Sequence, residues 1–251
     1  MMEPNAIAER YVAVWHQPDE TGRRQAIADV WARDGAYVDP TFDARGYDAI
    51  ERVVTSVHDE YVKTGEYFFR ACGNAQAHHN VLRFNWVLVQ SATAEVADSG
   101  QDILVLNSES QIENDYKFID SAVVPGQFAE FIDRYVAMWQ EPDEESRRKL
   151  VTELWAPDGT QVFPAGEPSG HQAMFERVTR SFNLFNQSGE YAFRSTGDAN
   201  GHHNLVRFNW EMVRTDNGEV ADVGFELFVR DDADRIRFDY QFIGPASPAD
   251  V

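Results

Sequence analysis

Two adjacent histidines, His78 and His79, are the first residues that could do chemistry, and they recur as His202 and His203. Neighbouring residues of a strand point to opposite faces, so the two side chains of a pair cannot chelate one metal ion together. No spaced set of His, Cys or carboxylate residues completes a site, so we expect no metal. One inward histidine, taken as His79, could act as a general acid or donate a hydrogen bond to a carbonyl. The alternative is a strand-end histidine capped by the adjacent turn.

Two aspartates, Asp39 and Asp102, are candidates for proton transfer. Asp39 precedes Pro40 at the end of a predicted strand, where an Asp-Pro pair is also ordinary turn chemistry. Asp102 lies in a predicted strand, either as a solvated side chain or as an inward carboxylate whose pKa burial would raise. Their counterparts in the second half of the chain are Phe163 and Glu226. If a reaction needs both carboxylates, only the first half has them.

Other reaction chemistries lack a motif in this sequence. There is no Gly-x-Ser-x-Gly segment, no glycine-rich loop before a helix that would cradle phosphates, and no dinucleotide fingerprint. We therefore expect a cofactor-independent enzyme or a binding protein.

The composition narrows the range of partners. The chain has 251 residues with 42 Asp and Glu against 22 Lys and Arg, a formal net charge of -20. Nucleic acids and anionic membranes both call for a basic face, so neither is expected as a partner. No apolar stretch approaches a membrane span of roughly 18 to 20 residues, and residues 1–5 lack the features of a signal peptide. We expect a soluble cytoplasmic protein that binds a hydrophobic small molecule. Cys72 is the only cysteine, so the sequence predicts no intrachain disulfide.

The elements that must position these residues come in two copies. Sliding the chain on itself by 124 residues aligns 10–119 with 134–243 without a gap, with 46 identities in 110 pairs. The repeat is domain-sized, so it indicates two globular domains, 1–122 and 123–251, and not a solenoid. The join at 121–126 reaches only about 20 Å when extended. We therefore expect an intrachain pseudo-dimer, which leaves room for a further homo-oligomer.

Each copy is predicted to open with helices and to continue with strands. In the first copy, apolar residues recur with helical spacing at 7–15, at 27–31 and at 49–61, and Gly65 ends the third helix. A short strand is expected at 36–39. The period then changes to two in the runs 67–72, 81–89, 96–106 and 112–119, which we interpret as antiparallel strands. This order is typical of an α+β domain with helices on one face of a sheet.

The order and spacing of several segments carry a resemblance over nearly all of both copies. In the first copy, the segments that carry the resemblance begin with the Trp-x-x-Asp-Gly segment 31–35, the strand 37–40 and a helix opened by Gly46. They continue with the His-His-Asn-x-x-Arg-Phe-x-Trp segment 78–86 and Gly100-x-Asp102 before the last strand. Together they resemble the SnoaL-like branch of the nuclear transport factor 2-like superfamily. The resemblance implies two tandem cone-shaped α+β barrels, each a cystatin-like roll of three helices on a strongly curved antiparallel sheet, with a pocket at the wide end.

The resemblance also suggests roles for individual residues. In SnoaL-like cyclases the acid/base carboxylate lies on a late strand, which favours Asp102 as the catalytic residue, with Asp39 at the pocket mouth. Arg83 either lies on the outer face, where the two domains would meet, or binds a substrate oxyanion in the pocket. The aromatic residues expected to wall the pocket and bind substrate are Tyr11, Trp15 and Trp86, and the second copy offers Glu226, Tyr135 and Trp139.

The resemblance to this family implies a general class of activity and no specific reaction. Its fold hosts isomerases, cyclases, dehydratases, epoxide hydrolases and proteins without catalysis. We expect a polyketide-cyclase-like or ketosteroid-isomerase-like enzyme that moves a proton next to a carbonyl of a hydrophobic, cyclic compound. The alternative is a non-catalytic small-molecule-binding or assembly protein of the same fold.

Overall fold

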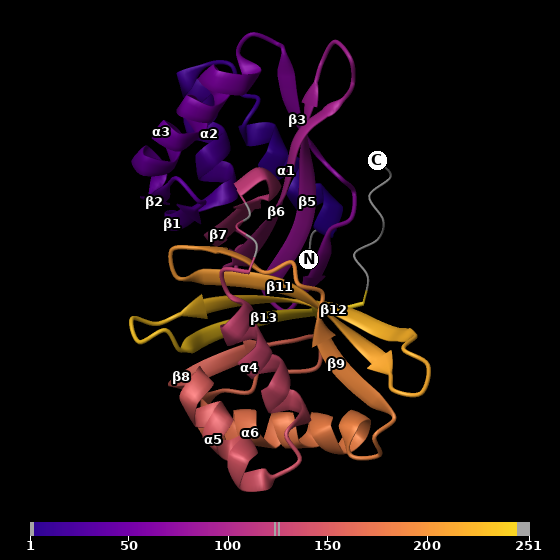
Figure 1. The fold of residues 1–251 in the computed structure, drawn as a ribbon. Helices are drawn as coiled ribbons and strands as arrows, with labels where there is room; N and C mark the ends of the chain where they lie inside the picture. Colours follow the sequence, from indigo (N-terminus) through magenta and orange to yellow (C-terminus); the bar gives the residue numbers. More distant parts are fainter. Residues whose placement is uncertain (1–2, 123, 125, 245–251) are drawn as a thin grey trace. The chain divides into compact units, whose positions relative to one another are not determined.

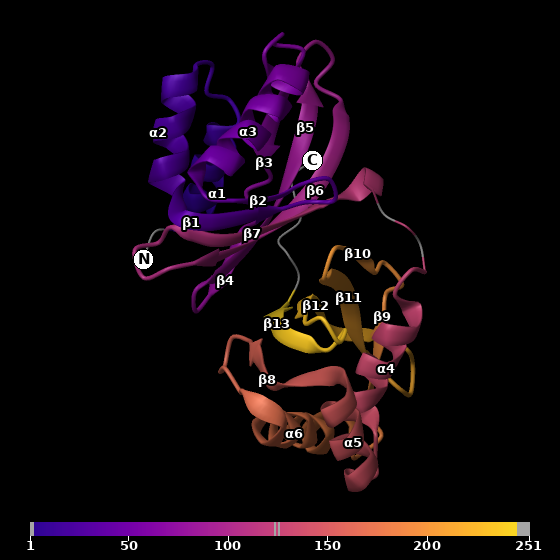
Figure 2. The same cartoon turned by 90° about the vertical axis from the view of Figure 1, so that its left-hand side faces the viewer.

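The computed structural model describes residues 3–122, 124 and 126–244 and divides the chain into two compact units near residue 123 (Figures 1 and 2). Each unit has its own sheet and its own three α-helices. The expected linker falls partly on residues 123 and 125, and the expected second domain runs on to 251; these positions lie outside the described residues. The pairing of the two units as a pseudo-dimer stays a prediction.

Three helices of the first unit cover one face of its sheet (Figure 2). They are α1 (Pro4–Val14), α2 (Glu20–Val30) and α3 (Tyr47–Val57), and α3 continues into a π-helical turn, His58–Val62. The Asp19 carboxylate caps α2 by accepting a hydrogen bond from the Gly22 amide at 2.8 Å. Nowhere in the described residues does a helix have the length and apolar character needed to cross a membrane.

Trp31 does not belong to the second helix, as its spacing had predicted. It is the residue at which α2 ends, with extended dihedral angles of -93° and 148°. The chain turns there onto the sheet, so the Trp31 indole enters the core from a strand, where it is fully buried.

The seven strands of the first unit form one sheet in the order β2-β1-β7-β6-β5-β3, with the short β4 also paired to β5. Their bounds are β1 (Trp31–Val38), β2 (Asp43–Arg45), β3 (Tyr67–Ala71), β4 (Gln76–His78), β5 (Val81–Gln90), β6 (Val96–Leu106) and β7 (Ile112–Ile119). The later strands pair antiparallel as predicted, but β1 runs parallel to β7. The sheet is therefore mixed, with antiparallel pairing among the strands from residue 67 onward. No hairpin joins β1 to β7, since α3 and five strands intervene, so nothing imposes antiparallel pairing on them.

The second unit repeats this α+β architecture with one difference. Its helices are α4 (Ala129–Gln140), α5 (Glu144–Leu154) and α6 (Gly170–Ser181), and its strands are β8 (Trp155–Val162), β9 (Tyr191–Ser195), β10 (Asn200–His202), β11 (Leu205–Arg214), β12 (Val220–Arg230) and β13 (Ile236–Ile243). The counterpart of β2 is reduced to isolated bridges. Pro168 stands where the first copy has Ala44, and a proline has no N–H to donate to a ladder.

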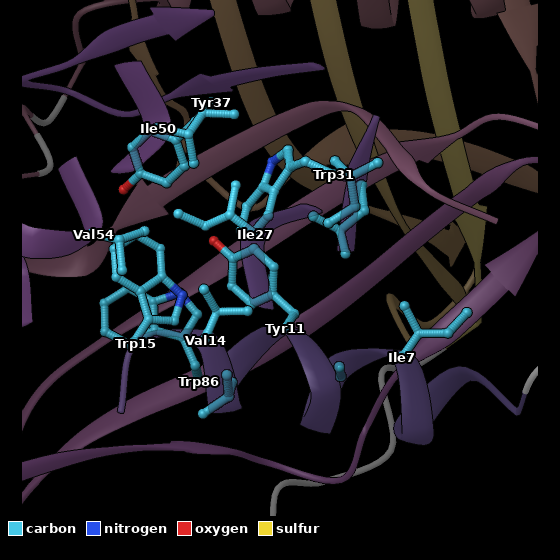
Figure 3. Close-up of a cluster of buried hydrophobic side chains, with 14 of the residues drawn as sticks. Ile7, Tyr11, Val14, Trp15, Ile27, Trp31, Tyr37, Ile50, Val54 and Trp86 are labelled. Carbon is cyan, nitrogen blue, oxygen red and sulfur yellow. The ribbon is translucent and has the colours of Figure 1, made fainter. Parts of the chain in front are cut away.

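An aromatic cluster forms the core of the first unit, between α1 and the sheet (Figure 3). The Tyr11 ring lies 5.3 Å from the Trp31 ring and 5.5 Å from the Phe84 ring. Two residues further along β5, on the same face as Phe84, the Trp86 indole lies across β6 at Gly100. A Cβ on Gly100 would overlap the Trp86 ring and the Phe118 carbonyl oxygen. The glycine of the Gly-x-Asp segment is thus required by the close approach of an indole.

We predict that Gly100→Ala lowers the free energy of unfolding by about 1–3 kcal/mol, the usual cost of overpacking a core, because the added methyl displaces Trp86. Urea unfolding of the full chain measures the change. Gly22→Ala in α2 is the control: its Cβ would meet only side-chain oxygens of Asp19 and Gln17, at 3.3–3.5 Å, and no backbone or ring atom, so it should cost much less than Gly100→Ala. Equal stability of the two variants would contradict this account of Gly100.

Candidate functional site

Alternation along three neighbouring strands brings polar side chains to the inner face of the first sheet. Phe84 of β5 is paired with Asp102 of β6, and Asp102 is paired with Lys117 of β7, so the three side chains share a face. Asp115 precedes Lys117 by two residues and points the same way. Phe84 belongs to the core cluster. Asp102, Asp115 and Lys117 therefore face the interior, and their exposed fractions are 0%, 0% and 7%.

Lys117 forms a buried ion pair inside an aromatic shell. Its Nζ lies 3.0 Å from Asp102 Oδ2. The same nitrogen lies 4.4 Å from the ring centroid of Trp86, 5.2 Å from that of Trp15 and 5.3 Å from that of Tyr11. The negative faces of these rings stabilise a cation that has lost water. A carboxylate and three aromatic rings thus surround the amino group of this buried lysine.

Asp102 and Asp115 form a carboxyl pair that shares a proton. Burial and the negative charge of Asp102 raise the pKa of Asp115 well above its usual range. Burial also raises the pKa of Asp102, but the Lys117 ammonium opposes that shift. Two carboxylates at one buried site cannot both ionise. Asp115 therefore holds the proton while Asp102 is the ionised partner of Lys117, and the group is neutral overall.

A cavity of about 290 Å³ opens beside this ion pair. Its walls are mainly aromatic, and its lining includes Trp15, Tyr61, Phe69, Trp86, Asp39 and Lys117. Among the described residues that line this cavity, neither Asp102 nor Tyr11 occurs. Lys117 is therefore the group through which the buried ion pair reaches the cavity.

Asp39 contributes a carboxylate to the same cavity, and hydrogen bonds hold it in place. Its Oδ1 accepts from the backbone amides of Thr41 and Phe42 at 2.7 and 2.6 Å, and its Oδ2 accepts from the Tyr37 hydroxyl at 2.7 Å. The turn role and the pocket role that the sequence left as alternatives are combined in this one side chain. Asp39 is 4% exposed.

The second unit also buries two carboxyl groups, Glu226 and Asp239, but in the part of the chain that the structure describes it has no lysine beside them. Glu226 Oε1 accepts hydrogen bonds from Trp210 Nε1 at 3.0 Å and from Gln241 Nε2 at 2.6 Å. Asp239 Oδ2 accepts from the Tyr135 hydroxyl at 2.8 Å and from Gln161 Nε2 at 2.9 Å.

The remaining oxygens of this pair, Glu226 Oε2 and Asp239 Oδ1, are buried without a donor. Burial and the charge of Asp239 raise the pKa of Glu226 well above its usual range, and burial also raises the pKa of Asp239. A proton shared by the two facing oxygens satisfies both, so this pair carries a single negative charge.

Glu226 also lines a cavity of the second unit, of about 120 Å³. The cavity wall includes Tyr135, Trp139, Arg177, Phe193, Trp210 and Gln241. The two units therefore differ in the side chains that reach the cavity: Lys117 and Asp39 in the first, Glu226 and Arg177 in the second.

Comparison with known proteins finds relatives among solved structures. No family model matches the chain, and a search of curated proteins finds no match either. A SnoaL-like protein from Agrobacterium tumefaciens str. C58, named as a candidate isomerase, has 28% identity and a TM-score of 0.43, over 47% of this chain and 98% of its own. A candidate SnoaL-like polyketide cyclase from Jannaschia sp. CCS1 has 13% identity and a TM-score of 0.38, over 48% and 87%. An NTF2-like protein of unknown function from Exiguobacterium sp. 255-15 has 19% identity and a TM-score of 0.37, over 46% and 99%.

The chain resembles SnoaL-like and NTF2-like proteins. Each of these structures matches about half of this chain. The resemblance expected from the sequence is confirmed.

The predicted site residues separate into three groups: those that line a cavity, those buried beside one, and those that lie elsewhere. Trp15, Trp86 and Asp39 line the first cavity, and Tyr135, Trp139 and Glu226 line the second. Tyr11 and Asp102 are buried beside the first cavity. His79 and Arg83 lie elsewhere.

His79 lies in the tight turn between β4 and β5, with φ of 50°, and is exposed. The expectation of an inward strand histidine is wrong for His79, because the turn removes it from the strand's alternation. Among the described residues, no three His, Cys, Asp or Glu side chains gather as metal ligands would.

Arg83 is on the outer face of β5, opposite the side that carries Phe84 and Trp86 into the core. Its guanidinium donates to Gln76 Oε1 at 2.8 Å. Arg83 is not a cavity-lining residue, so the alternative of an oxyanion donor in the pocket is not supported.

Sequence reasoning missed Asp115, Lys117 and Arg177. One signal was available, because Asp115 is identical in the other copy, as Asp239, inside an apolar strand. A second was the period of two, which places Asp115 and Lys117 on one face. Arg177 gave no such signal, since its counterpart is Val53.

We predict that Glu226→Gln reduces the loss of stability as the pH rises from about 5 to 8. Carboxyls of the unfolded chain release their protons near pH 4, whereas the folded pair keeps one because its pKa values are raised. Stability therefore falls with rising pH, by up to about 1.4 kcal/mol per pH unit, until the folded pair ionises. In the variant, the amide N–H can donate to Asp239 in place of the retained proton.

Urea unfolding at several pH values measures this slope. Glu219→Gln, at an exposed position, is the control and should keep the wild-type slope. A Glu226→Gln slope equal to the wild-type slope would show that the pair retains no proton.

Proposed function

We propose that the first unit is a cofactor-independent enzyme site of the SnoaL-like type, which moves a proton next to a carbonyl of a hydrophobic, cyclic small molecule. The observation that carries this proposal is the Lys117–Asp102 ion pair at the wall of an aromatic cavity that also contains Asp39. Double-bond isomerisation and cyclisation by an aldol step both begin with this proton transfer.

In the proposed reaction, Lys117 binds the carbonyl oxygen of the substrate. Lys117 lines the cavity, and its Nζ donates to Asp102 Oδ2 at 3.0 Å. Removing the proton beside a carbonyl places negative charge on the oxygen. A cation held in advance among aromatic rings stabilises that charge more strongly than water would, because the site has a low dielectric constant.

Asp39 is assigned as the group that accepts the proton. Its carboxylate lines the same cavity as Lys117, and donors from Tyr37, Thr41 and Phe42 fix its position. A fixed position matters because a displacement of about 1 Å can cost on the order of a hundredfold in rate. Asp102, the catalytic carboxylate expected from the sequence, then acts through Lys117 as a positioning residue and as its counter-ion.

The size of the cavity supports a cyclic substrate. An engineered apolar cavity of about 150 Å³ takes up benzene. The first cavity, of about 290 Å³, has room for more than one ring. Aromatic walls and few polar groups favour a substrate that is apolar apart from its carbonyl.

The second candidate function is non-catalytic binding, and the second unit favours it. There, Lys117 is replaced by Gln241 and Asp39 by Phe163. The second cavity thus has neither the ammonium group nor the mouth carboxylate. We therefore assign proton transfer to the first unit only.

We predict that the protein accelerates exchange of the α-hydrogens of 2-tetralone, a bicyclic ketone, with deuterium in D₂O. Proton NMR follows the loss of signal without knowledge of the natural substrate. Lys117→Gln should lower the catalysed rate about 10²- to 10³-fold, the usual effect of removing an oxyanion donor. Asp39→Phe should also abolish most exchange.

Both variants introduce the residue that the second unit carries at that position, so they are expected to fold. Lys63→Gln, which removes an exposed lysine with a surface ion pair to Asp59, is the control and should keep the wild-type rate. Exchange that is equally fast in the wild type and in Lys117→Gln would favour the binding function.

A further inference from the structure

The cavity of the second unit contains a cation among aromatic rings. The guanidinium carbon of Arg177, on α6, lies 4.4 Å from the ring centroid of Phe163 and 4.9 Å from that of Trp139. Arg177 is one of the residues that line this cavity. Burial lowers the pKa of Arg177, but an arginine stays charged at any ordinary pH.

Arg177 has no close counter-ion. Within the described part of the chain, no carboxylate oxygen lies within 4 Å of its guanidinium. Its one side-chain hydrogen bond is long, from Nη2 to Gln241 Oε1 at 3.4 Å, and its Nε is buried without a partner. A charge removed from water without a paired ion is costly, and a buried donor without an acceptor adds to that cost. These unmet requirements are those that a bound anion would satisfy.

We propose that the second cavity binds a monocyclic aromatic carboxylate, with the carboxylate on Arg177 and the ring among the aromatic walls. Guanidinium and carboxylate groups form paired, charge-assisted hydrogen bonds. The ring would contact Phe185, Phe193 and Trp210, which line the cavity. A volume of about 120 Å³ is below that of the cavity of about 150 Å³ that takes up benzene, so it limits the enclosed part of the ligand to one ring.

Two acidic side chains line the cavity, Glu226 and Asp222, and the first belongs to the pair that keeps a proton. Glu226 lines the cavity, but its pair with Asp239 shares a proton and carries a single negative charge, because burial raises the pKa of both groups. Asp239 is held by Tyr135 and Gln161 and does not line the cavity. Asp222 is the other lining carboxylate, and its Oδ1 accepts a hydrogen bond from the Val223 amide at 2.8 Å.

The first unit places its cavity cation differently. At the position of Arg177 it has Val53, and its own cation, Lys117, is replaced by Gln241 in the second unit. The carboxylate of Asp39 in the first cavity is also replaced, by Phe163. The two cavities therefore take different ligands, and this inference does not depend on the proton-transfer function assigned to the first.

We expect sodium benzoate, titrated into the full chain by calorimetry at low salt, to bind at one site. The titration uses the Lys117→Gln background, so that the first unit offers no buried lysine to the probe. Arg177→Met should weaken benzoate binding about 10- to 100-fold, because charge-assisted hydrogen bonds are lost. The benzoate affinity of Arg177→Lys should fall between that of the Lys117→Gln parent and that of Arg177→Met. Benzamide, which has no charge, should bind the parent and Arg177→Met equally weakly.

Arg180→Gln is the matched control: it removes an exposed arginine of the same helix and should change the benzoate affinity less than twofold. Arg177→Met should melt at or above the temperature of the parent, since it removes a poorly solvated charge. If the parent showed no saturable benzoate binding, or if Arg177→Met bound benzoate as tightly, the proposal would be overturned.

Discussion

Two carboxyl groups lie side by side on the inner face of each sheet, and the arrangement of both interiors depends on this. In water such groups ionise independently, but in an apolar interior only one of them can hold a charge. The other must keep a proton, and the charged one needs donors. In the first unit these groups are Asp102 and Asp115, and in the second Glu226 and Asp239.

The two units neutralise this negative charge in different ways, and their cavities differ as a consequence. Lys117 supplies a full positive charge in the first unit and brings it to the cavity wall. In the second unit neutral donors surround the pair, so a positive charge is no longer needed beside it. The cation of that cavity, Arg177, comes instead from a helix and stands apart from the carboxyls. Duplication thus allowed one fold to hold two different polar arrangements.

Much of the fold could be predicted from the sequence, because local patterns determine elements and the repeat could be checked against itself. The helices at 4–14 and 47–57 and the strands from 67 onward follow their apolar periods closely. The parallel pairing of β1 with β7 could not be predicted, since partners far apart in the chain leave no local pattern. The exposed turn position of His79 was missed because a two-residue turn breaks the alternation of a strand without changing its composition.

By itself, the sequence of this protein determined that there are two copies of an α+β domain, that they resemble SnoaL-like proteins, and that Asp39, Trp15 and Trp86 belong near a pocket. Only the tertiary structure decided that Asp102 is covered by Lys117, that Asp115 is its partner, and that Arg177 reaches the second cavity. The physical reason is that charge and protonation depend on neighbours across strands and between helix and sheet. Those neighbours are separated by many residues along the chain, and their distances are set only when the core packs.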